Sequence, residues 1–109
     1  PTGQFIELLW DFLHNRASSE SWEDLCRAIP YKDNLNYYFR MKDLSLFLAQ
    51  QRFTALKPNE MMAVLRSNLK AIKGFKNIGG RGTNYFQIPI PSNADQPTAL
   101  STPGFNTGY

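Results

Sequence analysis

The stretch GFKNIGGRGTNYFQIPI, residues 74–90, decides the fold predicted for this chain of 109 residues. Phe75–Ile78 and Asn84–Ile88 each have the composition of a short β-strand, and glycine-rich residues 79–83 lie between them. This arrangement is typical of a β-hairpin, because glycine readily adopts the positive φ angles of tight turns. A phosphate-binding loop does not fit, since that loop runs from a buried strand through Gly-Lys-Ser/Thr into a helix. We therefore predict a hairpin with Arg81 at its tip.

Upstream of the hairpin, residues 58–73 are predicted to form a basic helix. Pro58 suits the first helical position, and Glu60 lies in the first turn, where the helix dipole favours a negative charge. Gly74 is expected to end the helix in a left-handed conformation. Apolar residues that recur at helical spacing are predicted to face the core; they are Met61, Met62, Leu65, Leu69 and Ile72.

Four more elements are predicted in the first half of the chain. Apolar residues recur at helical spacing near the N-terminus, and aromatic residues dominate a short strand. Ser21 is placed to cap a short helix that Pro30 ends. The predicted elements are a helix over residues 4–16, a short helix over 22–29, a strand over 37–41 and a helix over 43–51, with loops over 31–36 and 52–57.

Length and composition indicate one small domain. Hydrophobic residues make up 42% of the chain, which is enough for one core and excludes global disorder. We assign the domain to residues 4–90. Residues 91–109 are rich in Pro, Ser, Thr, Asn and Gly, and we expect a flexible tail or linker there. Because the sequence begins Pro1-Thr2-Gly3 without a methionine, we expect the domain to be a piece of a longer protein.

The sequence lacks the residue sets that several function classes require. Cys26 is the one cysteine and cannot form an internal disulfide, and together with His14 it is too little for a zinc site. No pairing of a nucleophile with a histidine and no carboxylate pair in a glycine-rich setting indicates an enzyme. No apolar run approaches the roughly 20 residues of a membrane span, and no signal peptide is visible. We expect an intracellular domain, in the nucleus or the cytoplasm, with no catalytic activity, no metal and no cofactor.

Charges are segregated along the chain, although the formal net charge is only +3. Residues 1–30 hold five acidic residues and two arginines, whereas residues 61–94 hold five basic residues and no acidic one. Such segregation favours contact between one face of the domain and a polyanion. A solvated basic surface without a partner is the alternative.

The order of the predicted elements resembles the winged-helix variant of the helix-turn-helix. The resemblance is carried by the strand Phe39-Arg40-Met41, the helix that begins at Lys42-Asp43-Leu44, the turn before Leu56–Glu60, the helix Met61–Lys73 and the wing Gly74–Ile88. With the first helix it covers about residues 4–90. It implies a mostly α fold with a small antiparallel sheet, in which a three-helix core carries a C-terminal β-hairpin wing and, here, an extra short N-terminal helix.

Two families within this superfamily are similar in particular features. Leu9-Trp10-Asp11-Phe12-Leu13 is similar to the Leu-Trp-x-Phe-Leu that begins ETS-type winged helices, which also have a later Trp, a short strand and a final hairpin. The ETS recognition helix carries two arginines three residues apart, whereas here Arg66 is followed by Ser67-Asn68-Leu69-Lys70. The winged-helix modules of phage or plasmid primase-helicases are similar in layout and suit a piece of a longer protein.

The resemblance implies that helix 58–73 lies in the major groove of double-stranded DNA and that the wing touches the backbone or the minor groove. With the apolar stripe inward, Asn59, Arg66 and Ser67 face outward beside the small Ala63, and arginine can bond bidentately to guanine. The predicted DNA contacts are Asn59, Arg66, Ser67, Lys70, Lys73, Lys76 and Arg81. They would serve a larger replication, recombination or transcription protein, whose other domains are further partners.

Two alternatives use other parts of the chain. The first is a winged-helix module that docks a partner protein without touching DNA, through the acidic N-terminal helices or the aromatic segment 31–39. The second is binding of single strands or RNA, with bases stacked on aromatic side chains. The candidates for stacking are Tyr31, Tyr37, Tyr38 and Phe39.

Overall fold

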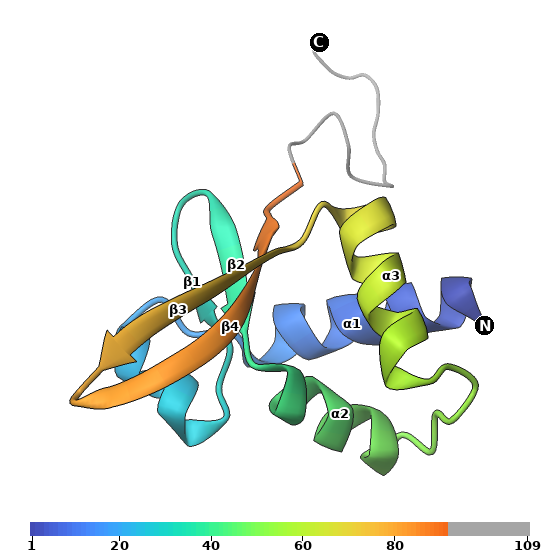
Figure 1. The fold of residues 1–109 in the computed structure, drawn as a ribbon, viewed down its shortest axis with the longest axis horizontal. Helices are drawn as coiled ribbons and strands as arrows, with labels where there is room; N and C mark the ends of the chain where they lie inside the picture. Colours follow the sequence, from blue (N-terminus) through green and yellow to red (C-terminus); the bar gives the residue numbers. More distant parts are fainter. Residues whose placement is uncertain (92–109) are drawn as a thin grey trace, which may run out of the picture.

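The computed structural model describes residues 1–91. Within them the chain forms a mixed α/β fold with four helices and a four-stranded antiparallel sheet (Figure 1). The elements in chain order are α1 (Thr2–Arg16), the 3-10 helix η1 (Trp22–Arg27), β1 (Tyr31–Lys32), β2 (Asn36–Phe39), α2 (Met41–Gln50), α3 (Pro58–Leu69), β3 (Ile72–Ile78) and β4 (Arg81–Pro89). Of the predicted tail, residues 91–109, all but Pro91 lies outside the described residues.

The sheet has the strand order β1-β2-β4-β3, so the last strand of the described chain lies inside the sheet. β2 pairs with β4 in antiparallel register, with Phe39 opposite Phe86. β3 and β4 form the C-terminal hairpin, which ends in the pair Ile78–Arg81 beside its turn. The tip of this hairpin extends away from α3 (Figure 1).

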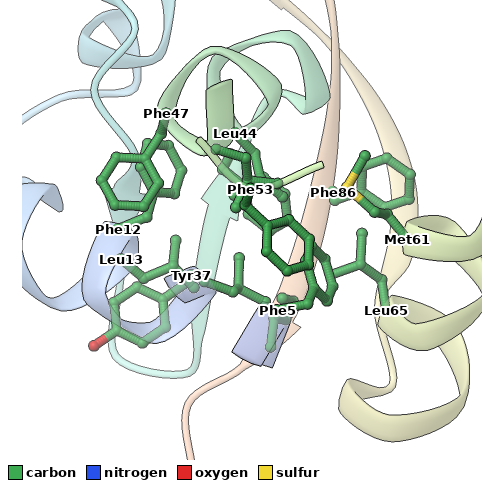
Figure 2. Packing of buried hydrophobic residues seen from close by; sticks show 14 residues of the cluster. Phe5, Phe12, Leu13, Tyr37, Leu44, Phe47, Phe53, Met61, Leu65 and Phe86 are labelled. Carbon is green, nitrogen blue, oxygen red and sulfur yellow. The ribbon is translucent and has the colours of Figure 1, made fainter. Parts of the chain in front are cut away.

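One face of the sheet, which we call the helical face, packs against the three α-helices. Because side chains alternate along a strand, Tyr37 and Phe39 of β2 share this face with Phe86 and Ile88 of β4. They join side chains of the α-helices in a single core cluster (Figure 2). The buried members of the cluster are Phe5, Leu9, Phe12, Leu13, Tyr37, Phe39, Leu44, Phe47, Leu48, Phe53, Met61, Leu65, Phe86 and Ile88.

The other face of the sheet, which we call the η1 face, is covered by η1. The Trp22 ring centroid lies 4.5 Å from that of Tyr38 and 5.6 Å from that of Tyr85. Closer to the hairpin turn, the Cys26 sulfur lies 4.0 Å from the hydroxyl oxygen of the buried Thr83. The aromatic residues packed here, the Trp22 cluster, are Trp22, Tyr31, Tyr38 and Tyr85.

The end of α3 differs from the predicted helix over residues 58–73. α3 ends at Leu69, and Lys70 takes the left-handed conformation (φ 57°) that was expected of Gly74. The N–H of Ala71 donates to the carbonyl of Leu65 at 3.0 Å and closes the helix end. The predicted boundary is wrong because a non-glycine residue can adopt this conformation at a cost of about 1–2 kcal/mol.

Gly74 lies instead inside β3, opposite Tyr85. A Cβ at Gly74 would come within 2.4 Å of the Tyr85 ring, so the glycine makes room for the ring to lie across β3. Since the strand begins at Ile72, that side chain is not in the core as predicted but is 59% exposed. The predicted role of Gly74 is wrong because the space beside it is taken by a residue distant in sequence.

The sheet is larger than predicted, so the fold is mixed α/β rather than mostly α. The hairpin loop is Gly79-Gly80 alone, with φ angles of 57° and 84° as a type I′ turn requires, and β4 begins at Arg81. The predicted loop over residues 31–36 contains β1, which pairs with β2. The boundaries of the other predicted helices and of the predicted strand agree with α1, η1, α2 and β2 to within two residues.

Candidate nucleic-acid interface

The local sequence fixes where α3 begins and which side it buries. Pro58 is the first helical residue, and the Glu60 carboxylate accepts a hydrogen bond from the backbone N–H of Lys57 at 2.7 Å. Met61 and Leu65, one turn apart, are buried in the core cluster (Figure 2). With these two anchors inward, the opposite side of α3 faces solvent.

The solvent-facing side of α3 carries residues predicted to contact DNA. Asn59, Ala63, Arg66 and Ser67 are all exposed. Asn59, Ala63 and Arg66 are four and three residues apart and form one row along the helix, and Ser67 lies beside this row, four residues after Ala63. The ion pairs found within the described residues do not include Arg66. Its guanidinium group is therefore available to a ligand.

Ser67 differs from the other exposed residues of α3. Its hydroxyl donates a hydrogen bond to the carbonyl of Ala63 within the helix. The hydroxyl oxygen can still accept a hydrogen bond, but a phosphate offers only acceptors. To donate to a phosphate, the Ser67 hydroxyl must therefore give up its hydrogen bond to Ala63. It can keep that hydrogen bond while it accepts another from the amino group of a base.

The two lysines predicted near the end of the helix belong to the connection and to β3. Lys70 is the exposed left-handed residue after α3, and Lys73 lies in β3 opposite Phe86. Because the Phe86 side chain is in the core cluster, Lys73 projects on the helical face of the hairpin. Arg66, Lys70 and Lys73 thus follow one another from α3 into the hairpin.

The other two predicted wing contacts lie on the η1 face. Lys76 is opposite Thr83, and Arg81 is two residues from Thr83 on the same face of β4. The Lys76 ammonium lies 4.9 Å from the centroid of the Trp22 ring, a cation–π arrangement that occupies the lysine within the protein. Lys73 therefore lies on the opposite face of the hairpin from Lys76 and Arg81.

η1 adds negative charge to the η1 face. Glu23 and Asp24 lie in its first turn, and a Cβ at Gly79 would be 3.4 Å from the Oε2 atom of Glu23, so this carboxylate reaches the hairpin turn. A polyanion on the η1 face meets that carboxylate. In α3 the one acidic residue is Glu60, whose carboxylate accepts from the Lys57 N–H at the start of the helix. From Met61 through β3 the sequence contains no acidic residue.

Three of the four aromatic residues predicted for single-strand binding are buried. Tyr37, Tyr38 and Phe39 are only 5%, 7% and 0% exposed, and Tyr31 is half-buried in the Trp22 cluster. This alternative is wrong for Tyr37, Tyr38 and Phe39 because β2 is covered on both faces. The exposed aromatic residue that the sequence analysis missed is Phe75, at 66% exposure. Its strand was predicted, but tertiary packing decides which face of a strand remains open.

Two other types of site are not found within residues 1–91. No group of His, Cys, Asp and Glu side chains there could hold a metal ion, and no helix is long and apolar enough to cross a membrane. Comparisons of the chain with protein-family models, with curated proteins and with solved structures found no match.

Proposed function

We propose that this domain is a winged helix that binds double-stranded DNA within a larger replication, recombination or transcription protein. The order α1, β2, α2, α3, β3, β4 and the pairing of β2 with β4 support the fold assignment. In this assignment α2 and α3 are the helix-turn-helix, β3 and β4 are the wing, and η1 with β1 is an addition after α1. The α2–α3 connection, residues 51–57, is longer than the three or four residues usual in a helix-turn-helix.

The observation that carries the proposal is the basic surface that continues from Arg66 of α3 into β3, a stretch in which the chain contains no acidic residue. Arg66, Lys70 and Lys73 are exposed along it in succession, while the acidic residues of η1 lie on the other face of the sheet. DNA phosphates favour such a surface, because each contact with a cation releases condensed counterions.

The predicted contacts have different roles in this proposal. Arg66 and Asn59 lie on the outer row of α3, where base edges in the major groove can accept and donate hydrogen bonds. Lys70 and Lys73 bind phosphates, which fixes the register of the helix on the duplex. Arg81 at the hairpin tip reaches the backbone or the minor groove, and Lys76, occupied by Trp22, contributes least.

Fluorescence anisotropy with a labelled random-sequence duplex tests the proposal. We expect Lys73→Ala to lower the slope of log affinity against log salt by about one, because one phosphate contact is lost. Arg66→Ala is expected to weaken binding by about 1–3 kcal/mol. Arg27→Ala is the control for net charge, since it removes the same charge from an exposed residue of η1; because Arg27 pairs with Asp24 at 3.3 Å, a thermal melt establishes that this variant is folded.

Equal effects of Arg27→Ala and Lys73→Ala would mean that only net charge matters, and the proposed interface would be wrong. If the duplex does not bind even at low salt, the domain is better described as a module that docks a protein partner. The exposed Glu23 and the half-buried Trp22 of η1 then become the first surface to test.

A further inference from the structure

Phe75 is an exposed aromatic residue on the helical face of the hairpin, beyond the reach of the core. It is 66% exposed and lies opposite Asn84 in the β3–β4 register. By strand alternation it shares this face with Lys73 and Asn77 of β3 and with Gly82 and Phe86 of β4. The ring turns toward Gly82 rather than toward the buried Phe86 and stays exposed, so burial in the hydrophobic core does not account for a phenylalanine at this position.

The Phe75 ring lies over Gly82 of the neighbouring strand. A Cβ at Gly82 would come within 2.6 Å of the ring atom Cζ and 3.1 Å of Cε1, so the end of the ring fills the space where a side chain would be. Gly82 therefore lets the ring rest on the backbone of β4 while most of its surface stays open to solvent. The ring is oriented before any ligand arrives.

We propose that Phe75 stacks on an unpaired base, so that the preferred ligand is a junction between duplex and single-stranded DNA. The inference rests on the proposed function, because it requires a duplex already held by α3. β3 begins at Ile72, so Phe75 lies three residues, about 10 Å, along the strand, and Lys70 and Ala71 connect the strand with α3. Lys73, two residues before Phe75 on the same face, joins the cations of α3 to the ring, so a duplex end held by α3 and Lys73 brings its overhang toward Phe75.

The charge and the polar groups around Phe75 favour nucleic acid as the occupant of this surface. Lys73 lies next to Phe75 on the same face and supplies a phosphate contact, while the amides of Asn77 and Asn84 can bond to base edges. The sheet separates this face from the Glu23 carboxylate on η1. An aromatic ring beside a cation is the arrangement that binds single strands, since every base has a face that can stack.

A purely structural role for Phe75 is the competing explanation, because an aromatic ring over a glycine also stabilises a strand pair. Phe75→Ile separates the two roles. Isoleucine keeps an apolar, strand-favouring side chain at this position but has no aromatic face. Phe75→Trp keeps and enlarges that face. Circular dichroism and thermal melting establish that each variant is folded.

The test measures affinity for a blunt duplex and for the same duplex with a single-stranded overhang of either polarity. We expect the wild type to prefer one overhang by about 5- to 150-fold, the range for one stacked base. Phe75→Ile should abolish this preference and leave blunt-duplex affinity unchanged, whereas Phe75→Trp should retain the preference. With 2-aminopurine as the first unpaired base, its fluorescence should change on binding the wild type but not on binding Phe75→Ile.

The possible failures are distinguishable. If Phe75→Ile keeps the overhang preference, or lowers the affinity for the blunt and the overhanging duplex equally, the stacking role is overturned while duplex binding by α3 stands. If the wild type binds blunt and overhanging duplexes equally, the junction is not the ligand. If neither duplex binds, the proposed function falls and this inference falls with it.

Discussion

On each face of the β3–β4 hairpin an aromatic ring lies over a glycine, but one ring is packed and the other is exposed. On the η1 face the Tyr85 ring lies over Gly74, and on the helical face the Phe75 ring lies over Gly82. Tyr85 is packed against Trp22, with ring centroids 5.6 Å apart, whereas Phe75 is 66% exposed. An aromatic residue over a glycine therefore becomes part of a cluster or an open surface according to what covers it.

The coverage comes from η1, which lies over only one face of the hairpin. Since Cys26 and Thr83 are in contact although they are 57 positions apart, the hairpin alone does not contain the information that selects its covered face. The comparison predicts that substitutions on the η1 face mainly affect stability. Substitutions on the helical face beyond the core should mainly affect binding.

The largest expected difference is in the free energy of unfolding of two variants, Trp22→Ala on the η1 face and Phe75→Ala on the helical face. Removing a buried tryptophan costs about 3–5 kcal/mol, and because Trp22 is half-buried we expect a loss of about 2–3 kcal/mol. Phe75→Ala should cost less than about 1 kcal/mol, the range of a cross-strand pair. Urea unfolding followed by circular dichroism measures both. Equal losses would show that the two faces are not different in packing.

The two glycines give the next comparison. In Gly74→Ala the new Cβ would lie 2.4 Å from a Tyr85 ring that is confined by its cluster, and overpacking of this kind costs about 1–3 kcal/mol. In Gly82→Ala the Phe75 ring can swing into solvent, so we expect a change within about 0.5 kcal/mol.

A double-variant cycle provides the control for this pair. If the cost of Gly74→Ala comes from the Tyr85 ring, that cost should be much smaller in a Tyr85→Ala background. A cost that is unchanged in this background would place its origin in the backbone of β3 rather than in the ring.

Two lysines of β3 should separate stability from binding. Lys76→Ala removes the cation over Trp22 and should destabilise the fold by about 0.5–1 kcal/mol with little change in duplex affinity. Lys73→Ala should lower the duplex affinity with little change in stability, because the Lys73 side chain is exposed and takes part in no ion pair within the described residues. Lys76→Arg, which keeps the charge over the ring, should retain wild-type stability. A weaker duplex affinity for Lys76→Ala than for Lys73→Ala would contradict the assignment of faces.

The smallest effect is expected at the far end of the Trp22 cluster, where the Tyr38 hydroxyl donates to the Asp33 carboxylate at 2.7 Å. Partial burial acts to raise the pKa of Asp33, but the hydrogen bonds from Tyr38 and from the N–H groups of Leu35 and Asn36 lower it overall. A carboxyl group with a lowered pKa in the fold adds stability above its unfolded pKa, and that stability is lost as the pH falls through the folded pKa.

Asp33→Asn should therefore lower the melting temperature slightly at neutral pH, and the difference from the wild type should shrink below about pH 4. Thermal melts of both proteins from neutral pH to about pH 2.5 measure this. A difference that stays constant over the whole range would mean that the charge of Asp33 has no part in the stability of the β1–β2 turn.

Much of the fold could be predicted from local sequence, because its signals act within a few residues. Pro58 and Glu60 mark the start of α3, apolar spacing marks α1 and α2, and two glycines with positive φ mark the hairpin turn. The glycine signal was also the source of the main error. Gly74 suits a helix end and a strand crossed by an aromatic ring equally well, and only the position of Tyr85 decides between them.

The candidate site was predictable as a set of cations but not as a surface. The segregation of charge pointed to α3 and the hairpin, and Arg66 and Ser67 are indeed exposed on α3. Lys73 and Lys76 lie on opposite faces of the hairpin because side chains alternate along β3, which begins at Ile72. The predicted helix extended through Lys73, so this separation was not predicted. The open ring of Phe75 could not be predicted, because exposure is the result of what packs nearby.

By itself, the sequence determined the kinds of elements, their order and the absence of acidic residues in residues 61–91. These properties follow from backbone propensities and from composition, which are local. Only the tertiary structure decided that η1 covers one face of the hairpin, that Lys76 is held over Trp22 and that Phe75 remains open. The reason is that a strand presents its residues to both faces alike, and contacts from distant parts of the chain determine which face is buried.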